Sequence, residues 1–186
     1  MAHISDLRAG IYTYLDIHTV APVDATDTAA EYAALFVGST PGTADTSDGD
    51  TTGVAEHLRM PSVREFPSIG TPANIVNVPV YGQASSSQVQ GQADAPNLEI
   101  TINYNAADAG DLHDLIGKAV TFRFMMVDAA CTLDEAADTT LSGKANTAFY
   151  FNGKVEAILV NPSLTDATTA TVTLSTQSDF FGPATK

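Results

Sequence analysis

The sequence contains no tryptophan, one cysteine and only eight lysine and arginine residues in 186 positions. The single cysteine, Cys131, cannot form a disulfide within the chain, which argues against a cross-linked secreted scaffold. The eight bases stand against 22 acidic residues and give a net charge of -14 at pH 7. Because nucleic-acid binding depends on neutralising phosphates, this balance excludes a DNA- or RNA-binding protein of the usual kind.

Long hydrophobic runs are also missing from the sequence. No apolar stretch approaches the ~20 residues that span a bilayer, and the N-terminal residues lack the basic and apolar regions of a signal peptide. We therefore expect no membrane span, and synthesis and assembly in a cytoplasm. The length is typical of a single domain, residues 1–186. Much of the 44% apolar content is alanine, which predicts a thin core.

Residue patterns for catalysis or ligand binding are sparse. His113 lies between Asp111 and Asp114, a spacing that fits an exposed helix surface better than a zinc site. The segment 45–50 resembles a calcium loop, but aligning Gly49 with the loop glycine puts alanines at the first and last ligand positions. Nucleophile-elbow and phosphate-loop motifs are absent. We therefore expect no metal, no cofactor and no enzymatic activity, with an enzyme built on an unrecognised acid pair as a weaker alternative.

Basic residues do not form a patch either. Arg59, Arg64 and Arg123 are scattered along the chain. A scattered arginine is more often a solvated or paired side chain than part of a binding site. The profile of an acidic protein without an evident active site favours an assembly subunit over a catalyst.

Runs of β-branched and aromatic residues predict strands at 11–17, 32–37, 75–81, 98–104, 120–127, 148–160 and 171–176. The segment 98–104 alternates cleanly between apolar and polar residues, which is typical of a strand with one wet face. Pro79 favours an edge position for the segment 75–81, because proline cannot donate to a ladder. The pair Asn152-Gly153 predicts a tight turn or a bulge, and residues 162–166 the last connection.

Helical signals are short. Residues 108–117 predict one helix, with Asp108 as its cap and Gly117 as its stop. Thr132 and Glu135 have the spacing of a capping box, which indicates a further helical turn. Residues 38–53 indicate a long loop, either functional or disordered. The predicted fold is all-β with a small α part, a β-sandwich or barrel flanked by one short helix and carrying a long loop insertion.

The order of segments between Glu65 and Thr176 resembles that of the major tail proteins, or tail tube proteins, of long-tailed, siphovirus-like bacteriophages. The resemblance rests on Glu65-Phe-Pro-Ser-Ile-Gly-Thr-Pro, on Asn77-Val-Pro-Val-Tyr-Gly, on the strand 98–104 with its following helix, and on Phe149-Tyr-Phe-Asn-Gly-Lys-Val. It covers the last two thirds of the chain. The acidic N-terminal third does not match residue by residue.

The resemblance implies a tail-tube domain of the immunoglobulin-like sandwich type that forms homo-hexameric rings, stacked helically into a hollow tail tube of the virion. It implies that the tube encloses a tape-measure protein, meets tail-tip and tail-terminator proteins, and conducts DNA during ejection. A lumen of carboxylates would repel phosphate, so that DNA could pass without binding.

The resemblance also suggests two sets of site residues. Residues 38–58 are a candidate inter-ring or surface loop, with Thr40, Asp45, Asp48 and Asp50 as the candidate contact residues. The wet face of the strand 98–104 is a candidate lumenal face, with an outer solvated face as the alternative; its residues are Glu99, Thr101 and Asn103. The alternative function is an immunoglobulin-like or lectin-like binding module on a virion or cell surface.

Overall fold

The computed structural model describes residues 12–19, 28–37, 57–70, 75–79, 81–82, 85–91, 96–137 and 146–184. These residues form ten strands and three short helices. The strands are β1 (Thr13–His18), β2 (His57–Arg59), β3 (Val63–Glu65), β4 (Ile75–Val78), β5 (Ser87–Gln90), β6 (Asn97–Asn103), β7 (Ala119–Val127), β8 (Asn146–Asn161), β9 (Thr169–Thr176) and β10 (Phe181–Ala184). The helices are α1 (Ala29–Leu35), α2 (Ala106–His113) and α3 (Leu133–Ala137).

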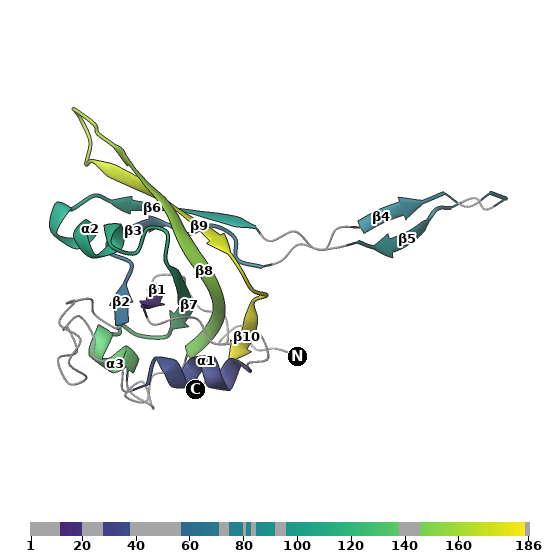
Figure 1. Cartoon of the computed structure of the whole chain (residues 1–186), viewed down its shortest axis with the longest axis horizontal. Coiled ribbons are helices and arrows are strands. Elements are labelled where there is room, and N and C mark those ends of the chain that lie inside the picture. Colours follow the sequence, from purple (N-terminus) through teal and green to yellow (C-terminus); the bar gives the residue numbers. More distant parts are fainter. Residues whose placement is uncertain are drawn as a thin grey trace.

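Eight strands form one curled antiparallel sheet, shown in Figure 1. Their order is β2-β1-β7-β8-β9-β6-β3, with β10 pairing beside this path on β8. The two end strands, β2 and β3, are separated in sequence by residues 60–62 alone. The amide of Met60 donates to the Leu15 carbonyl at 2.8 Å, and the amide of Asn103 donates to the Ser62 carbonyl at 3.0 Å. The chain therefore passes directly from one end of the sheet to the other, and the sheet curls toward a barrel.

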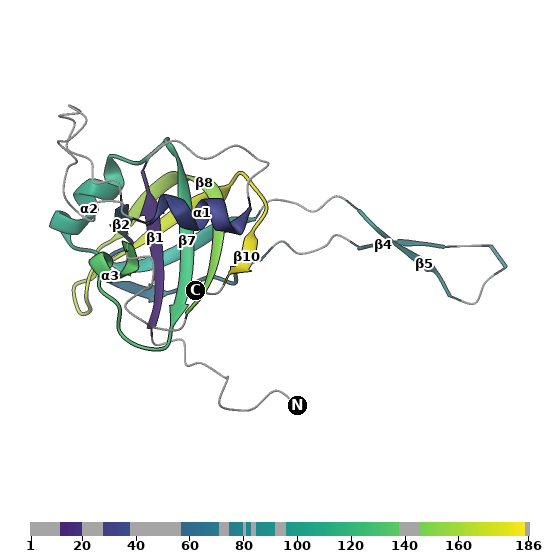
Figure 2. The same ribbon diagram turned by 90° about the horizontal axis from the view of Figure 1, so that it is seen from below.

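One apolar core fills the concave side of this sheet. Its residues come from six strands, from Leu112 of α2 and from Leu115 in the turn that follows this helix. Phe122 of β7 and Phe151 of β8 stack at its centre, with ring centroids 5.0 Å apart. The opposite face of β1, β7 and β8 is covered by α1, as Figure 2 shows. The predicted class, all-β with a small α part, is confirmed, although three short helices rather than one accompany the sheet.

The predicted strand at 98–104 is confirmed as β6. Burial alternates along it: Leu98, Ile100 and Ile102 are buried in the core. The predicted strands 11–17, 120–127 and 171–176 correspond to β1, β7 and β9. The capping box near Cys131 is also confirmed, because the Thr132 amide donates to Glu135 Oε2 at 2.8 Å and the Glu135 amide donates to Thr132 Oγ1 at 3.2 Å.

The predicted strand at 32–37 is wrong, because this segment belongs to α1 and the turn that follows it. Thr28 and Glu31 form a capping box, in which the Thr28 amide donates to Glu31 Oε2 at 2.7 Å. Tyr32 and Phe36 are four residues apart, which is the spacing of one helix face, and both are fully buried. The surrounding alanines add helix propensity that the strand prediction ignored.

Two further predictions need correction. Asn152-Gly153 is neither a turn nor a bulge but lies inside β8, which runs unbroken from 146 to 161. The irregularity falls slightly later, where the register with β9 shifts between Val155 and Ala157. The predicted strand 75–81 ends at Val78, before Pro79, and pairs with β5 in a separate two-stranded sheet. It is therefore not an edge of the main sheet.

We expect Gly153→Ala to lower the free energy of unfolding by about 1–3 kcal/mol, because the added methyl would overpack a site bounded by backbone. A Cβ at this position would lie 2.7 Å from the Ser175 carbonyl oxygen. Urea denaturation followed by circular dichroism measures the effect. Gly110→Ala is the matched control: its Cβ would meet no atom within 4 Å, and alanine in α2 should stabilise by about 0.4–1 kcal/mol. Equal changes for both variants would contradict the packing account.

Candidate functional site

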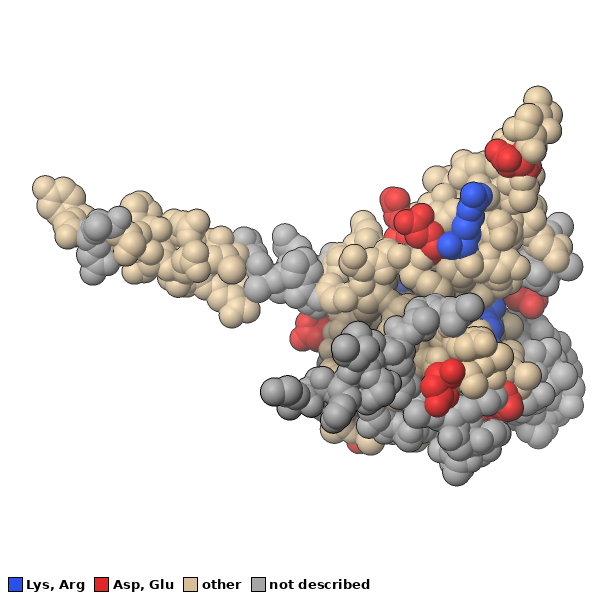
Figure 3. Space-filling view, turned by 180° about the vertical axis from the view of Figure 1, so that it is seen from behind, with Lys and Arg blue, Asp and Glu red and all other residues tan. Residues whose placement is uncertain are grey.

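The hairpin formed by β4 and β5 projects away from the curled sheet (Figures 1 and 2) and is called the arm below. Its two strands pair antiparallel from Ile75 with Gln90 to Val78 with Ser87. All eight strand residues are exposed. No residue from Phe66 to Ala93 is acidic or basic, and the described residues of the arm show no charged side chain in Figure 3. The arm is thus an uncharged surface on a strongly acidic protein.

The pairing register gives the arm two different faces, because directly paired residues in an antiparallel ladder point to the same side. One face carries Val76, Val78 and Val89, which are between 41% and 53% exposed. The other carries three amides and one exposed apolar side chain: Asn77, Gln88, Gln90 and Ile75. Beyond β4, Tyr81 is fully exposed. An isolated two-stranded hairpin is at best marginally stable in water, and a patch of exposed apolar side chains marks an interaction site.

The hairpin of β8 and β9 is a second projection, visible at the upper left of Figure 1. Leu159 and Val160 near its end are exposed, and Leu164 in the connection is fully exposed. Along residues 156–161, β8 pairs with β9 on one side, and no described strand pairs with its other side. An open strand edge of this kind is a template for pairing with another chain.

The predicted site residues lie in two different situations. Thr40, Asp45, Asp48 and Asp50 lie outside the described residues, as does most of the segment 38–58; its last two residues begin β2 and are buried. The other set lies on β6, opposite the core, where each residue pairs with a threonine of β9: Glu99 with Thr173, Thr101 with Thr171, and Asn103 with Thr169. We call these six residues the hydroxyl face. Its one charge is Glu99.

A buried charged cluster lies on the α1 side of the sheet, around Asp16 of β1. Asp16 is completely buried and is the cross-strand neighbour of Arg59 on β2 and Arg123 on β7. Arg59 Nε donates to Asp16 Oδ1 at 2.8 Å, and Arg123 Nη2 donates to Asp16 Oδ2 at 2.7 Å. The prediction that such arginines are paired or solvated is confirmed for these two. Asp16 could not be predicted as their partner, because only the strand register brings the three residues together.

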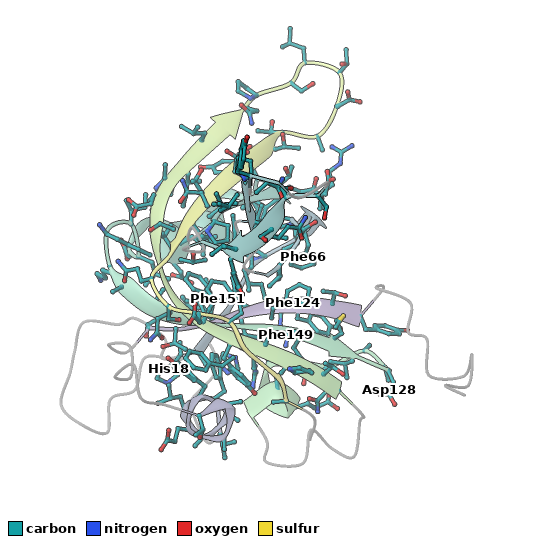
Figure 4. The ribbon with its side chains drawn as sticks, turned by 90° about the vertical axis from the view of Figure 1, so that its right-hand side faces the viewer. His18, Phe66, Phe124, Asp128, Phe149 and Phe151 are labelled. Atoms are coloured by element: carbon teal, nitrogen blue, oxygen red, sulfur yellow. The ribbon has the colours of Figure 1, made fainter. Side chains whose placement is uncertain are left out.

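Aromatic and imidazole rings complete the cluster. His57 Nε2 lies 3.6 Å from Asp16 Oδ2. The ring of Phe36 meets His18 and His57 edge-on at centroid distances of 5.6 and 5.3 Å, and the Arg123 guanidinium lies 4.3 Å from its centroid. Figure 4 shows His18 on the side of the sheet that faces α1, away from Phe66. The cluster therefore ties β1, β2 and β7 to the residue that follows α1.

Burial and neighbouring charges shift the pKa values of Asp16 and His18 in this cluster. Burial alone would raise the pKa of Asp16, but the hydrogen bond with His57 and the charges of Arg123 and Arg59 outweigh it and hold the pKa well below its usual value. Burial, with the neighbouring His57 and Arg123, lowers the pKa of His18 to about 4. A fully buried carboxylate with two arginine partners is closed to substrate, so we interpret the cluster as structural.

Within the described ranges, no group of three or more histidine, cysteine, aspartate or glutamate side chains is placed to hold a metal ion. None of the helices described is long and apolar enough to cross a membrane. Three exposed surfaces of the described residues are open to contacts with other macromolecules: the arm, the open edge of β8 and the hydroxyl face.

No protein-family model matches the chain, and no curated protein matches it. Among solved structures, the chain is similar to a crystal structure of an Hcp protein, with 14% sequence identity and a TM-score of 0.41. That match covers 88% of this chain and 87% of the other.

We expect the free energy of unfolding to fall as the pH is lowered from 6.5 to 4, in part because of His18. Its pKa is about 4 in the folded state against 6.5 as the ordinary value. The unfolded chain therefore binds more protons within this window, and acidification favours it. His18→Gln should reduce this loss by about 2 kcal/mol after allowance for solvent screening, measured by urea denaturation at several pH values. The control is His113→Gln on the exposed surface of α2; an identical pH profile for both variants would contradict the assignment.

Proposed function

We propose that this protein is a structural subunit that assembles with copies of itself into stacked rings forming a hollow tube. The more specific form of the proposal is the hexameric tail tube of a long-tailed bacteriophage virion, assembled in the host cytoplasm around a tape-measure protein. The tube would end at tail-tip and tail-terminator proteins. The observation that carries the proposal is the uncharged, exposed arm. We assign no enzymatic role to the subunit.

Charge explains why the arm supports self-assembly. Copies that each carry a net charge of -14 repel one another when their surfaces approach within the screening length, about 8–10 Å at physiological salt. A segment without charges, from Phe66 to Ala93, avoids this repulsion. Its valine face also gains free energy when it is covered, at roughly 25 cal/mol per Å² of apolar surface. The arm is therefore the part of the described surface best suited to contact another copy.

The open edge of β8 supports ring formation in a complementary way. A strand from a neighbouring copy could pair along residues 156–161 and extend the sheet, satisfying backbone groups at the edge. The same contact would cover Leu159 and Val160. A ring of such subunits would join their sheets into one continuous inner wall, as the resemblance to tail tube proteins implies.

The hydroxyl face is our candidate for the lumenal wall. It presents threonine, asparagine and a single carboxylate, Glu99, and no cation. A wall of this kind offers no positive charge to the phosphate groups of DNA. DNA could therefore pass along it without binding. The same face on the outside of a tube is the alternative. No described feature favours an immunoglobulin-like or lectin-like binding module over the tube.

We expect the double variant Val76→Glu/Val89→Glu to abolish rings and tubes in negative-stain electron microscopy, because it places carboxylates on the valine face of the arm. Light scattering across a concentration series should show assembly for the wild-type protein and not for the variant. The free energy of unfolding should change by less than about 0.5 kcal/mol, since the substituted side chains are exposed.

The matched control is Asn77→Asp/Gln88→Glu, which adds the same charge to the amide face of the arm. We expect it to weaken assembly less than the valine-face variant does. Unchanged tubes formed by the valine-face variant would refute the role of the arm. A wild-type protein that stays monomeric even with a tail-tip complex added would refute tube formation.

Lumenal placement of the hydroxyl face predicts selective protection from labelling. In assembled tubes, Thr101→Cys should react with a small maleimide but not with a bulky polyethylene-glycol maleimide, whereas free subunits should react with both. Ala30→Cys on the exposed side of α1 serves as the outer control and should react with both reagents in either state. The native Cys131 is buried and provides the unlabelled background. Full reaction of Thr101→Cys with the bulky reagent in tubes would place the face outside.

A further inference from the structure

A small hollow opens on the body of the protein between β2, α2 and α3, with a volume of about 180 Å³. Four apolar residues and two charged residues line it: Leu58, Arg59, Pro61, Asp111, Leu112 and Leu133. Pockets for drug-sized ligands are larger, about 300–1,000 Å³. The hollow is therefore suited to a single side chain of a partner rather than to a free cofactor or substrate.

The guanidinium group of Arg59, in the wall of the hollow, is held in place by contacts with the interior of the protein. Arg59 Nε donates to Asp16 Oδ1 at 2.8 Å, and its Nη1 donates to the Cys131 carbonyl at 2.6 Å. Its guanidinium also lies 4.0 Å from the centroid of the Tyr14 ring. The Arg59 side chain is 19% exposed, so it reaches the surface without being free to move. A site that is already ordered costs little additional entropy when it binds.

The chemistry of the hollow favours an uncharged guest with an apolar body and a polar end. Arg59 and Asp111 in its lining carry opposite charges, so an anionic side chain would be repelled by Asp111 and a cationic one by Arg59. A tyrosine has the required form, because its ring is apolar and its hydroxyl can both donate and accept a hydrogen bond. The hydroxyl could donate to the Asp111 carboxylate or accept from Arg59.

The protein itself presents such a side chain. Tyr81 follows β4, is fully exposed and lies within the uncharged stretch from Phe66 to Ala93. The arm extends from one end of the molecule, whereas β2, α2 and α3 lie toward the other end in both Figure 1 and Figure 2. A contact between two such separate surfaces is heterologous, and repetition of it builds rings or filaments rather than closed dimers.

We propose that the arm of one copy inserts Tyr81 into the hollow between β2, α2 and α3 of the next copy. The inference rests on the proposed self-assembly and assigns the receptor for the arm. The proposed contact depends on the buried cluster, because Asp16 holds Arg59 at the wall of the hollow. The guest is a second copy of this chain, whose uncharged arm avoids the repulsion that any acidic segment would meet.

Disulfide trapping between two separately labelled proteins tests the contact. Tyr81→Cys protein is mixed with Pro61→Cys protein under assembly conditions and oxidised, and the products are separated by non-reducing electrophoresis. We expect a mixed dimer. Tyr81→Cys mixed with Ala30→Cys, whose cysteine lies on α1 outside the hollow, is the control and should give none. No mixed dimer with Pro61→Cys, or equal amounts with both partners, would overturn the docking.

Two variants of the guest provide a second readout. Tyr81→Ser should raise the concentration needed for tube formation at least about tenfold, equivalent to about 1.4 kcal/mol, whereas Tyr81→Phe should raise it less because it keeps the ring. Folding is not at risk, since Tyr81 is exposed. If the Tyr81→Ser protein assembles normally, and the Tyr81→Cys and Pro61→Cys proteins form no cross-link, the docking is overturned. The proposed function is then left intact. Failure of the wild-type protein to form rings or tubes, even with a tail-tip complex added, overturns the proposed function itself.

Discussion

Scarcity of positive charge is the constraint on which the rest of this structure depends. Of the eight basic residues, Arg59 and Arg123 are committed to the buried carboxylate of Asp16. Removing one partner from such a buried group leaves an uncompensated charge, which costs about 3–5 kcal/mol. The cluster therefore holds β1, β2 and β7 together and orients Phe36 after α1. It also withdraws cations from the surface, which leaves carboxylates dominant there.

An acidic surface sets a condition for self-association: contacts must be made where charge is absent. The arm meets this condition, with valines on one face, amides and Ile75 on the other, and Tyr81 beyond β4. The open edge of β8 meets it through backbone groups, which pair independently of side-chain charge. Both features would be liabilities for a protein that remained a monomer, because exposed apolar residues and unpaired edges promote aggregation. In the proposed tube, regular assembly would turn the same features into interfaces.

Local patterns predicted those elements whose burial alternates or whose ends carry capping residues. β6 follows from strict alternation between residues 98 and 104, and α3 from the spacing of Thr132 and Glu135. α1 was missed because its aromatic residues also suit a strand, and the helix depends on the Thr28 cap and on packing against β8. β5 was missed because its sequence, Ser-Gln-Val-Gln, has only one apolar residue and so gives a weak alternation. It pairs only with β4 in an exposed hairpin, so no buried face marks it in the sequence.

The sequence by itself determined the composition of the surfaces: the net charge of -14, the uncharged stretch from Phe66 to Ala93 and the polar face of β6. These depend on residue identity and short-range periodicity, which a linear chain displays directly. Tertiary structure alone decided which distant residues meet. Strand register brought Asp16 between Arg59 and Arg123, and curling of the sheet placed β2 beside α2 and α3 to form the hollow. Such contacts depend on the whole core, because register and curvature are set by how all the strands pack together.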